Sequence, residues 1–541
     1  MKGELHMLMK KLSNEKKIIC TILLIIALIQ FLFVLYCNFF ELRSHLGWDS
    51  SWLTLKITLV QKEKALISSN WIEQTNPFFD SSIMLAVPIY ALLNDVFLAY
   101  GIANNIVFLM IVICFIGILK RLDIDAMGQL VACNLLMCPY LTQGLNINNE
   151  LGYFACFLAT PAAYNVRMLC VLLLFRELIV IIQENRVRIV WWCVCAILCF
   201  VAGTSSGLYL FIMFLFPCYI YVLARVIKNN DLMYLRTLDC LFVVINSTVL
   251  FVGKNISKLL LDVEAVDITR RWISVEEIWT NIGAVFQGFL RLLNVLPPYA
   301  DSNVEIISKK GIITIFPIFI LVVVVIALAY RFNQIHRTTD KEDLLELAFT
   351  IVCVNFIIFS LYKVGYGNHI FEERYLISTY LFVILIVGAY ISRLDIAQVF
   401  SKMVILILLL GVIGTNIFSD YIYLNSTNDS WNMEIIKETA EENSTDLIYF
   451  WGKEINGAGR AMRAYDLEHI YKQISEEGRY VHFGDYLDYE NNSDYNGATL
   501  LVVNKNDNCV PEEIMNQYTL EKNIGWGYIY KCDYNPISIC N

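Results

Sequence analysis

Charged side chains are scarce in this sequence of 541 residues. They make up 17% of the chain, whereas hydrophobic residues make up 57%. Soluble domains carry about 25% charged residues, so the chain as a whole is too apolar for a soluble protein. The sequence also lacks a block of consecutive basic residues, which argues against nucleic acid as a partner.

Cysteine patterns typical of metal sites are missing as well. Of the sixteen cysteines, thirteen fall in or beside hydrophobic runs, where cysteine behaves as a small apolar residue. The other three, Cys509, Cys532 and Cys540, lie in the polar C-terminal tail, and their spacing matches no metal-binding pattern. The sequence is equally compatible with one disulfide among them and with three unpaired thiols.

The N-terminus has no features of a cleaved signal peptide. Four lysines precede an uncharged run from Ile18 to Phe40, and they are Lys10, Lys11, Lys16 and Lys17. This run is longer than the apolar core of a signal peptide and has no small-residue cleavage site, so we expect a retained first helix. Its basic flank predicts a cytoplasmic N-terminus.

Long apolar runs recur along the chain. Each is close to the ~20 residues that a helix needs to cross about 30 Å of hydrocarbon, and the short alternating segments of a membrane barrel are not seen. We expect an all-α polytopic membrane protein with about eleven transmembrane helices. The runs lie near 18–39, 96–119, 127–144, 164–182, 189–204, 207–226, 238–252, 311–330, 344–361, 375–392 and 399–418.

The distribution of positive charge indicates which connections lie outside. Segments expected on the inside carry lysine or arginine, whereas the short outer connections near 145–163 and 204–206 carry neither. This orientation places two long loops, 40–95 and 253–310, on the outer face. Each loop contains one expected interfacial helix, a short apolar one at 81–93 and an amphipathic one at 275–296.

The last segment, 419–541, is polar and rich in tyrosine. Strand-like runs at 446–451, 498–503 and 527–530, with a helical pattern from about Arg460 to Ile474, predict a small α/β domain that can bury its own core. An odd number of spans places this domain outside the cell. We therefore divide the chain into a membrane domain, 1–418, and an extracytoplasmic domain, 419–541.

An acidic residue lies between two tryptophans soon after the first expected span. The segment reads Trp48-Asp49-Ser50-Ser51-Trp52. Transfer of a sugar to a hydroxyl needs a carboxylate near the anomeric carbon, because the acceptor must lose its proton as it attacks. Asp49 is therefore the candidate catalytic base. The alternative is that Trp48 and Trp52 are interfacial lipid anchors and that Asp49 caps a helix.

A second polar loop, 362–375, precedes the tenth expected span. Arg374 lies where that span meets the outer interface, and an arginine there can bind a phosphate through bidentate, charge-assisted hydrogen bonds. His369 or Lys363 can add a second donor. The alternative is that Arg374 pairs with one of the two glutamates before it and extends toward the lipid headgroups.

Other arginines lie near or within the expected spans. Arg270 and Arg271 precede the amphipathic segment and can bind phosphate or headgroups, although an ordinary interfacial anchor is the alternative. Arg167 and the pair Arg176-Glu177 lie at the depth of a span, where ionisable groups usually face the interior of a helix bundle.

With these features the layout resembles the GT-C class of polytopic glycosyltransferases. That class includes protein O-mannosyltransferases, aminoarabinose transferases and many bacterial surface-polysaccharide enzymes. The resemblance covers residues 1 to about 418. It rests on the cytoplasmic N-terminus, the acidic residue in a long first outer loop, the interfacial helices and the sequence Arg374-Tyr375-Leu376 where a span begins. It implies that Asp49 matches the catalytic aspartate of the class and that Arg374, with His369, matches its phosphate-binding element.

The resemblance also implies a polyprenyl-phosphate or polyprenyl-diphosphate sugar as the donor. Many members of the class carry two adjacent acidic residues in the first loop, whereas Asp49 is followed by serine. The candidates for a second acid are therefore Glu41, Glu63, Glu73 and Asp80. No cofactor is certain, and a divalent metal stays open.

The predicted function is transfer of a polyprenyl-linked sugar to a glycan, lipid or protein acceptor on the outer face of the plasma membrane. A polysaccharide polymerase or ligase is an alternative of similar chemistry. A transporter or flippase of lipid-linked glycans is an alternative from another class. It should show repeated halves and broken helices that meet at the middle of the membrane, and the sequence shows neither.

Overall fold

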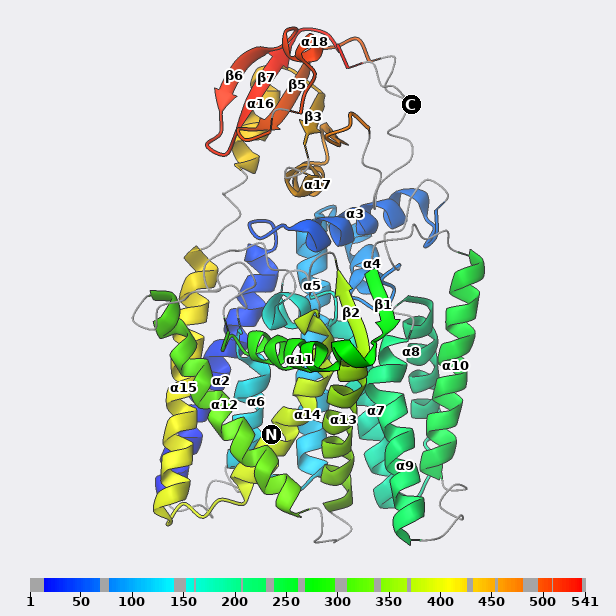
Figure 1. Ribbon diagram of the computed structural model, residues 1–541, viewed down its shortest axis with the longest axis vertical. Coiled ribbons are helices and arrows are strands. Elements are labelled where there is room, and N and C mark those ends of the chain that lie inside the picture. The colour runs from blue at the N-terminus through cyan, green and yellow to red at the C-terminus, as the bar shows by residue number, and fades with distance from the viewer. Residues whose placement is uncertain are drawn as a thin grey trace.

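The computed structural model is a bundle of long helices with a small domain containing a mixed β-sheet at one end (Figure 1). The structure describes residues 14–68, 77–140, 152–159, 162–205, 208–229, 238–260, 268–296, 309–334, 342–366, 371–425, 432–452, 456–479, 495–507 and 509–537.

Seven helices in the described ranges are long and apolar enough to cross a membrane. They are α2 (Asn14–Tyr36) with the π-helical turn η1 (Cys37–Glu41), α5 (Val96–Arg121), α10 (Leu238–Leu260), α12 (Lys309–Gln334), α13 (Glu342–Leu361), the 3-10 turn η6 (Glu373–Leu376) with α14 (Ile377–Ser392), and α15 (Val399–Asn425).

The other predicted spans correspond to helices that are shorter or carry ionisable residues. They are α6 (Ala126–Met137), α7 (Asn165–Glu184), α8 (Ile189–Ser205) and the π-helical turn η3 (Phe211–Leu215) with α9 (Phe216–Asn229). Every predicted span therefore has a helix at its position, and Figure 1 shows these helices running side by side in the bundle. The predicted all-α membrane architecture is confirmed, and the protein is an integral membrane protein.

The end of the first helix is held tightly against α5. The Asn38 side chain donates hydrogen bonds to Asn105 Oδ1 (3.0 Å) and to the Leu158 carbonyl oxygen (3.1 Å). At this crossing, a Cβ atom on Gly101 would lie 2.0 Å from the Asn38 carbonyl oxygen. The two backbones approach so closely that only glycine fits at this position of α5, as at other small-residue contacts between membrane helices.

We expect Gly101→Ala to lower the yield of folded protein strongly, because the new methyl group forces η1 away from α5. Gly283 of α11 (Ile278–Leu292) is a matched control, since no atom lies within 4 Å of the place its Cβ would take. Size-exclusion chromatography of detergent extracts measures the yield. A monodisperse peak of wild-type height for Gly101→Ala, equal to that of Gly283→Ala, would contradict the close approach.

The first long loop contains one more helix than we expected. The helix predicted at 81–93 is α4 (Ile83–Leu93), but α3 (Trp48–Glu63) precedes it. Figure 1 shows α3 lying across the end of the bundle, beneath the C-terminal domain. It packs against both α4 and α17 (Asn456–Tyr465). Because both sides of α3 are covered, its apolar residues do not gather in one stripe, and the sequence pattern of an amphipathic helix is absent.

The amphipathic helix predicted at 275–296 is confirmed as α11, which Figure 1 shows crossing the bundle. The Asn281 side chain fixes it to the end of α13 by donating to the carbonyl oxygens of Phe359 (2.7 Å) and Ser360 (3.1 Å). Val285 and Phe289 are buried against the bundle, whereas Trp279 on the outer side is 81% exposed. This division of buried and exposed apolar surface suits a helix at a lipid interface.

A small two-stranded sheet joins the second long loop to the loop before α14. Its strands are β1 (Ile268–Trp272) and β2 (Tyr362–Tyr366), and they pair antiparallel with Arg271 opposite Lys363. No pattern in the sequence predicts this pairing, because each strand has only five residues and the two are far apart in the chain.

The C-terminal domain contains a five-stranded sheet in the order β4-β3-β5-β7-β6. Its strands are β3 (Leu447–Trp451), β4 (Ile470–Ile474), β5 (Thr499–Asn504), β6 (Thr519–Asn523) and β7 (Gly527–Cys532). The strand β3 lies between β4 and β5 and is parallel to both, and the remaining pairs are antiparallel. The helix α16 (Met433–Glu442) precedes the sheet, and α18 (Glu512–Met515) is a single turn between β5 and β6.

The three predicted strands are present, but the predicted helix from Arg460 to Ile474 is wrong in its second half. The helix α17 ends at Tyr465, and the residues from Ile470 form β4. Asp466 stops the helix because its carboxylate accepts hydrogen bonds from the Glu468 backbone (3.0 Å) and the Tyr471 hydroxyl (2.8 Å). The domain division after residue 418 stays a prediction, and α15 itself continues to Asn425.

Cys509 and Cys532 of this domain are both free thiols, and Cys540 lies outside the described residues. The structure therefore does not support the alternative of a disulfide between Cys509 and Cys532.

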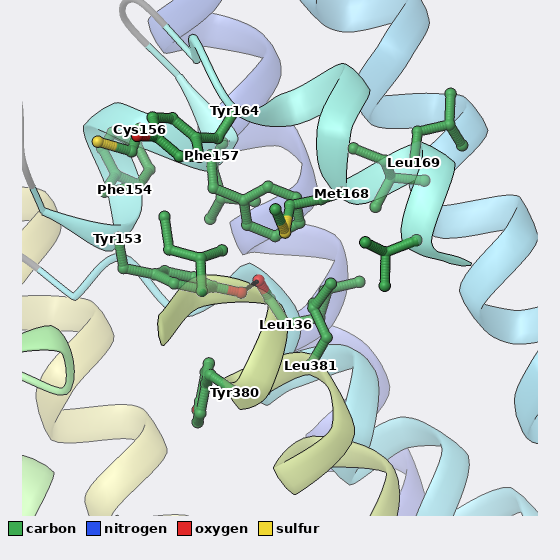
Figure 2. Close-up of a cluster of buried hydrophobic side chains, with 14 of the residues drawn as sticks. Leu136, Tyr153, Phe154, Cys156, Phe157, Tyr164, Met168, Leu169, Tyr380 and Leu381 are labelled. Carbon is green, nitrogen blue, oxygen red and sulfur yellow. Dashed lines mark hydrogen bonds between the residues drawn. The ribbon is translucent and has the colours of Figure 1, made fainter. Parts of the chain in front are cut away.

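A cluster of buried hydrophobic side chains, several of them aromatic, lies inside the bundle (Figure 2). Tyr153 donates a hydrogen bond to the Leu136 carbonyl oxygen (2.7 Å), and the hydroxyls of Tyr140 and Tyr380 lie 2.6 Å apart. These polar groups are therefore satisfied within the core, as burial requires. The cluster gives the loops and short helices above it a rigid support.

Candidate active site

A buried ion pair joins the first long loop to the membrane bundle. Arg167, near the start of α7, donates from Nε to Asp80 Oδ2 (2.6 Å) and from Nη2 to Asp80 Oδ1 (3.0 Å). Both side chains are almost fully buried. The guanidinium also lies 4.5 Å from the ring centroid of Tyr164 and 5.0 Å from that of Phe78. The bidentate hydrogen bonds and the contacts with the two aromatic rings offset the free-energy cost of removing the guanidinium from water.

Tyrosine side chains connect this ion pair to the segment that carries Arg374. The ring of Tyr164 packs edge-on against Tyr209 at 5.8 Å. The Tyr209 hydroxyl donates to the Tyr375 carbonyl oxygen (3.3 Å), and the rings of Tyr209 and Tyr375 lie 6.2 Å apart. The residue after Arg374 is therefore linked, through buried contacts, to the pair formed by Asp80.

Arg374 lies in the short turn η6, directly before α14. About a fifth of its side chain is exposed, and its Nε is 3.9 Å from Glu372 Oε2. Glu372 and Glu373 are both buried. The helix α11 packs over this turn, since a Cβ on Gly288 would lie 2.6 Å from the Phe371 ring. The site thus combines a partly exposed guanidinium with two buried carboxylates at the turn where α14 begins.

Asp49 lies in the first turn of α3, after Gly47 as the N-cap residue. The side chains of Asp49 and Trp48 lie outside the described residues, so their predicted roles stay predictions. The turn itself is well held, because Ser50 Oγ accepts a hydrogen bond from the Gly47 backbone (2.7 Å). Ser50 therefore accepts from the backbone N–H at this helix end, and Asp49 is not required as the acceptor for that group.

Trp52 does not lie at the lipid interface, in contrast to the alternative in which it is a lipid anchor. Its side chain is buried, and its ring lies 4.9 Å from that of Phe78, two residues before Asp80. The same side of α3 buries Lys56 near the Phe79 ring, and this burial lowers the pKa of Lys56 to about 7. These contacts show that α3 packs directly on the Asp80 loop and that the packing excludes water.

Glu41 lies at the end of the first span and accepts local hydrogen bonds. The donors are the hydroxyls of Tyr36 (3.0 Å) and Ser44 (2.7 Å). The neighbouring His45 stacks on Tyr423 of α15 with ring centroids 4.0 Å apart. Glu41 thus helps to hold the start of the first loop.

Asp80, another candidate for a second acid, is fully occupied by Arg167. Both carboxylate oxygens of Asp80 accept hydrogen bonds from the Arg167 guanidinium, so Asp80 suits a positioning role better than that of a second acid.

The remaining predicted donors have different surroundings. Lys363 is half-buried on β2, and His369 lies outside the described residues. The side chain of Arg270 is also outside them. Arg271 forms a bidentate, exposed ion pair with Glu277 (2.8 and 2.6 Å), and this arginine holds the pKa of Glu277 at about 2. An arginine held in this way matches an interfacial anchor.

The sequence hypothesis missed several residues of this site. Arg167 was noted as an ionisable group at span depth, but its partner Asp80 could not be identified from 87 positions away. Glu372 and Glu373 were considered only as partners of Arg374, although two adjacent acids at the start of a span are themselves unusual. Among the described residues, no three side chains that bind metals converge, so a metal site is not defined here.

Comparison with known proteins identifies the fold. No family model matches the sequence, and no curated protein matches it. Solved structures do match over nearly the whole chain, and the match shows that this chain shares their fold.

Two of these structures are of ArnT from Cupriavidus metallidurans. The one bound to undecaprenyl phosphate has a TM-score of 0.55 and 10% identity, covering 96% of this chain and 98% of ArnT. The apo structure has a TM-score of 0.54 and 10% identity, covering 94% of this chain and 97% of ArnT. The predicted resemblance to the GT-C class is confirmed at the level of the fold.

Proposed function

We propose that this protein transfers a sugar from a polyprenyl-phosphate-linked donor to a glycan, lipid or protein acceptor at the outer face of the plasma membrane. The observation that carries this proposal is the likeness in fold, over nearly the full chain, to ArnT with undecaprenyl phosphate bound. The charge asymmetry of the connections supports the outer location, with a cytoplasmic N-terminus and an extracytoplasmic C-terminal domain.

In the proposed reaction each group of the site has a distinct role. The acceptor hydroxyl gives its proton to the Asp49 carboxylate while its oxygen attacks the anomeric carbon. The bond between that carbon and the donor phosphate oxygen breaks, and the polyprenyl phosphate leaves with the electron pair. Arg374, with Lys363 and His369 as further donors, stabilises the charge that develops on the phosphate.

The ion pair of Asp80 and Arg167 holds the part of the loop directly before α4, residues 77–82, in place. It therefore positions Asp49 indirectly, since α3 packs on that loop through Trp52. Small displacements of a catalytic group cost large factors in rate, so a buried, bidentate pair is a suitable support. Glu41 supports the start of the first long loop, before α3.

The proposal is tested with purified protein in proteoliposomes that contain a panel of polyprenyl-phosphate sugars. Release of free polyprenyl phosphate, followed by chromatography and mass spectrometry, is the expected result in the presence of an acceptor extract. Movement of intact donor across the bilayer without release of polyprenyl phosphate would contradict the transferase and favour the transporter.

We expect Arg374→Ala to lower kcat/KM for the donor by about 100-fold, because the loss of one preorganised donor to a developing charge costs about that factor. Arg374→Lys should recover part of the activity, since it keeps the charge but not the bidentate geometry. Arg271→Ala is the matched control, because it removes an exposed arginine paired with Glu277. Equal turnover of the Arg374→Ala and Arg271→Ala variants would remove Arg374 from the site.

A further inference from the structure

The loop that follows the first span is joined to the last span, α15, by the ring of His45. His45 is buried, and its ring stacks on that of Tyr423 with centroids 4.0 Å apart and an angle of 4° between the planes. Nδ1 lies 2.9 Å from the carbonyl oxygen of Glu41, and Nε2 lies 3.1 Å from the carbonyl oxygen of Tyr423. Each ring nitrogen is therefore within hydrogen-bonding distance of a main-chain oxygen.

These two oxygens determine which protonation state suits the ring of His45. A carbonyl oxygen only accepts hydrogen bonds, whereas a neutral imidazole has one N–H group and one nitrogen with a lone pair. In either neutral tautomer, one of the two carbonyl oxygens would face that lone pair with no proton between them. The doubly protonated ring donates to both oxygens, so the arrangement favours the imidazolium form.

The hydroxyl of Ser44 does not replace the second ring proton. Its oxygen lies 3.2 Å from Nδ1 of His45, but the hydroxyl donates its single proton to Glu41 Oε2 (2.7 Å). If the hydroxyl donated to Nδ1 instead, that nitrogen would still face the Glu41 carbonyl oxygen at 2.9 Å. Ser44 therefore suits the role of a further acceptor for the Nδ1 proton.

A carboxylate beside the ring adds to the preference for the charged form. Glu41 Oε2 lies 3.7 Å from Nδ1 of His45. Burial of the ring opposes its charge, whereas an opposite charge at this distance and two hydrogen bonds favour it. The hydrogen bonds and the carboxylate together offset the cost of burial.

The other ionisable neighbours leave this preference in place. Arg43, the cation nearest to His45 in the sequence, lies over the ring of Tyr465 in the C-terminal domain (4.2 Å to the centroid). Asp420, one turn before Tyr423 on α15, adds attraction when it is ionised. The remaining ionisable side chains close to the contact in the sequence are neutral at physiological pH, and they are Tyr36, Cys37 and Tyr421.

The contact lies directly before the helix that carries Asp49. His45 is two residues before Gly47, the N-cap residue of α3. On the other side of the contact, the ring of Tyr423 packs edge-on against that of Phe154, with centroids 5.0 Å apart. His45 therefore joins the start of α3 to a packed part of the bundle.

We propose that His45 is a positioning residue for the reaction, and that its doubly protonated ring fixes the start of α3, and with it Asp49, to the last span. Loss of one ring proton removes one of the two hydrogen bonds and loosens the contact. Small displacements of a catalytic group cost large factors in rate, so transfer should decline as the pH rises through the midpoint of His45. The effect on Asp49 rests on the proposed function, whereas the protonation state of the ring does not.

Hydrogen–deuterium exchange at the C2 carbon of histidine, followed by mass spectrometry, measures the protonation of His45 in the purified full-length protein. We expect half-protonation at about pH 7.5 or higher, compared with about 6.5 for an isolated histidine, because the surroundings favour the charged ring. The same peptide in denaturant is the control and should return about 6.5. A midpoint below about 7.5 in the folded protein would overturn the proposal.

Thermal unfolding of the wild type and His45→Gln provides a second measurement. Below the ordinary pKa of histidine the ring is charged in both the folded and the unfolded protein, so its stabilising effect is complete there, and the effect is lost as the pH rises through the midpoint of the folded protein. We expect His45→Gln to unfold a few degrees lower at about pH 6, and the difference to fall by at least about half at about pH 9. An equal difference at both pH values would overturn the protonated contact.

Tyr423→Phe is the matched control, because it keeps the carbonyl oxygen and the stacked ring. Its difference from the wild type should be the same at both pH values. A pH-dependent difference as large as that of His45→Gln would contradict the assignment to the ring of His45. If His45→Gln fails to fold, the exchange measurement on the wild type alone decides the question.

The pH profile of kcat tests the link to Asp49. In the wild type, kcat should fall at alkaline pH with the midpoint of His45, whereas His45→Gln should have a lower kcat, a similar KM for the donor and no such fall. A variant with the wild-type profile would overturn the positioning role. A raised midpoint in a protein that transfers no sugar contradicts the proposed function alone, and sugar transfer with an ordinary midpoint contradicts this inference alone.

Discussion

Asp49→Asn is expected to abolish sugar transfer while leaving expression, membrane insertion and folding intact. Asparagine has nearly the shape of aspartate but cannot take a proton from the acceptor. Loss of a general base costs about 100- to 10,000-fold in rate, so transfer should fall by at least about 100-fold. The release of polyprenyl phosphate under saturating donor measures this loss, and the thermal unfolding profile checks that the fold is kept.

Asp95→Asn is the matched control for that experiment. Asp95 caps α5 by accepting a hydrogen bond from the Leu98 backbone (3.0 Å), and asparagine caps helices about as well. The control should keep wild-type activity. Full transfer activity in Asp49→Asn would remove Asp49 from the mechanism, and attention would pass to Glu372 and Glu373 beside Arg374.

Arg167→Met is expected to be one of the most destabilising single changes in the protein. It leaves the Asp80 carboxylate buried without its counter-ion, and removal of one partner of a buried pair costs about 3–5 kcal/mol. We expect a large fall in the thermal unfolding temperature in detergent and poor recovery of monodisperse protein. Circular dichroism during heating and size-exclusion chromatography measure the two effects.

The double variant Asp80→Leu with Arg167→Met separates the loss of the charge pair from the loss of packing. Removal of both charges should recover much of the lost stability, because apolar residues often replace a buried pair without cost. Lys437→Met breaks a partly exposed pair with Glu441 and should change little. If Arg167→Met unfolds at the same temperature as Lys437→Met, the pair does not support the loop.

The membrane helices were predictable because the bilayer fixes their length. A run of about 20 apolar residues has few alternatives to a spanning helix, and every such run in the sequence became a helix. The amphipathic helix α11 was predictable for a related reason, since one covered side leaves a stripe of apolar residues. These elements are determined by local patterns that a single sequence contains.

The elements that depend on contacts with distant parts of the chain were not predictable from the sequence. The helix α3 is covered by α4 on one side and by α17 on the other, so Trp52, Lys56 and their neighbours have no one-sided pattern. The strands β1 and β2 pair although α11, α12 and α13 lie between them in the chain, and β4 follows a turn that depends on the hydrogen bonds of Asp466. Each depends on a partner that is distant in the sequence.

The candidate site shows the same division. Arg374 was predicted where a span begins, and η6 is there. The partner of Arg167 could not be predicted, because an arginine at span depth indicates a buried contact but does not identify it. The two tyrosines that link this pair to Tyr375, Tyr164 and Tyr209, belong to separate segments and have no motif in common.

A structure with a bound polyprenyl phosphate, determined by cryo-electron microscopy of the protein in lipid nanodiscs, would show whether Arg374 and Asp49 share one site. We expect the phosphate within about 3 Å of the Arg374 guanidinium, the distance of a charge-assisted hydrogen bond. We also expect the Asp49 carboxylate on the wall of the same cavity. A phosphate bound elsewhere in the bundle, with Arg374 and Asp49 facing different spaces, would contradict the shared site.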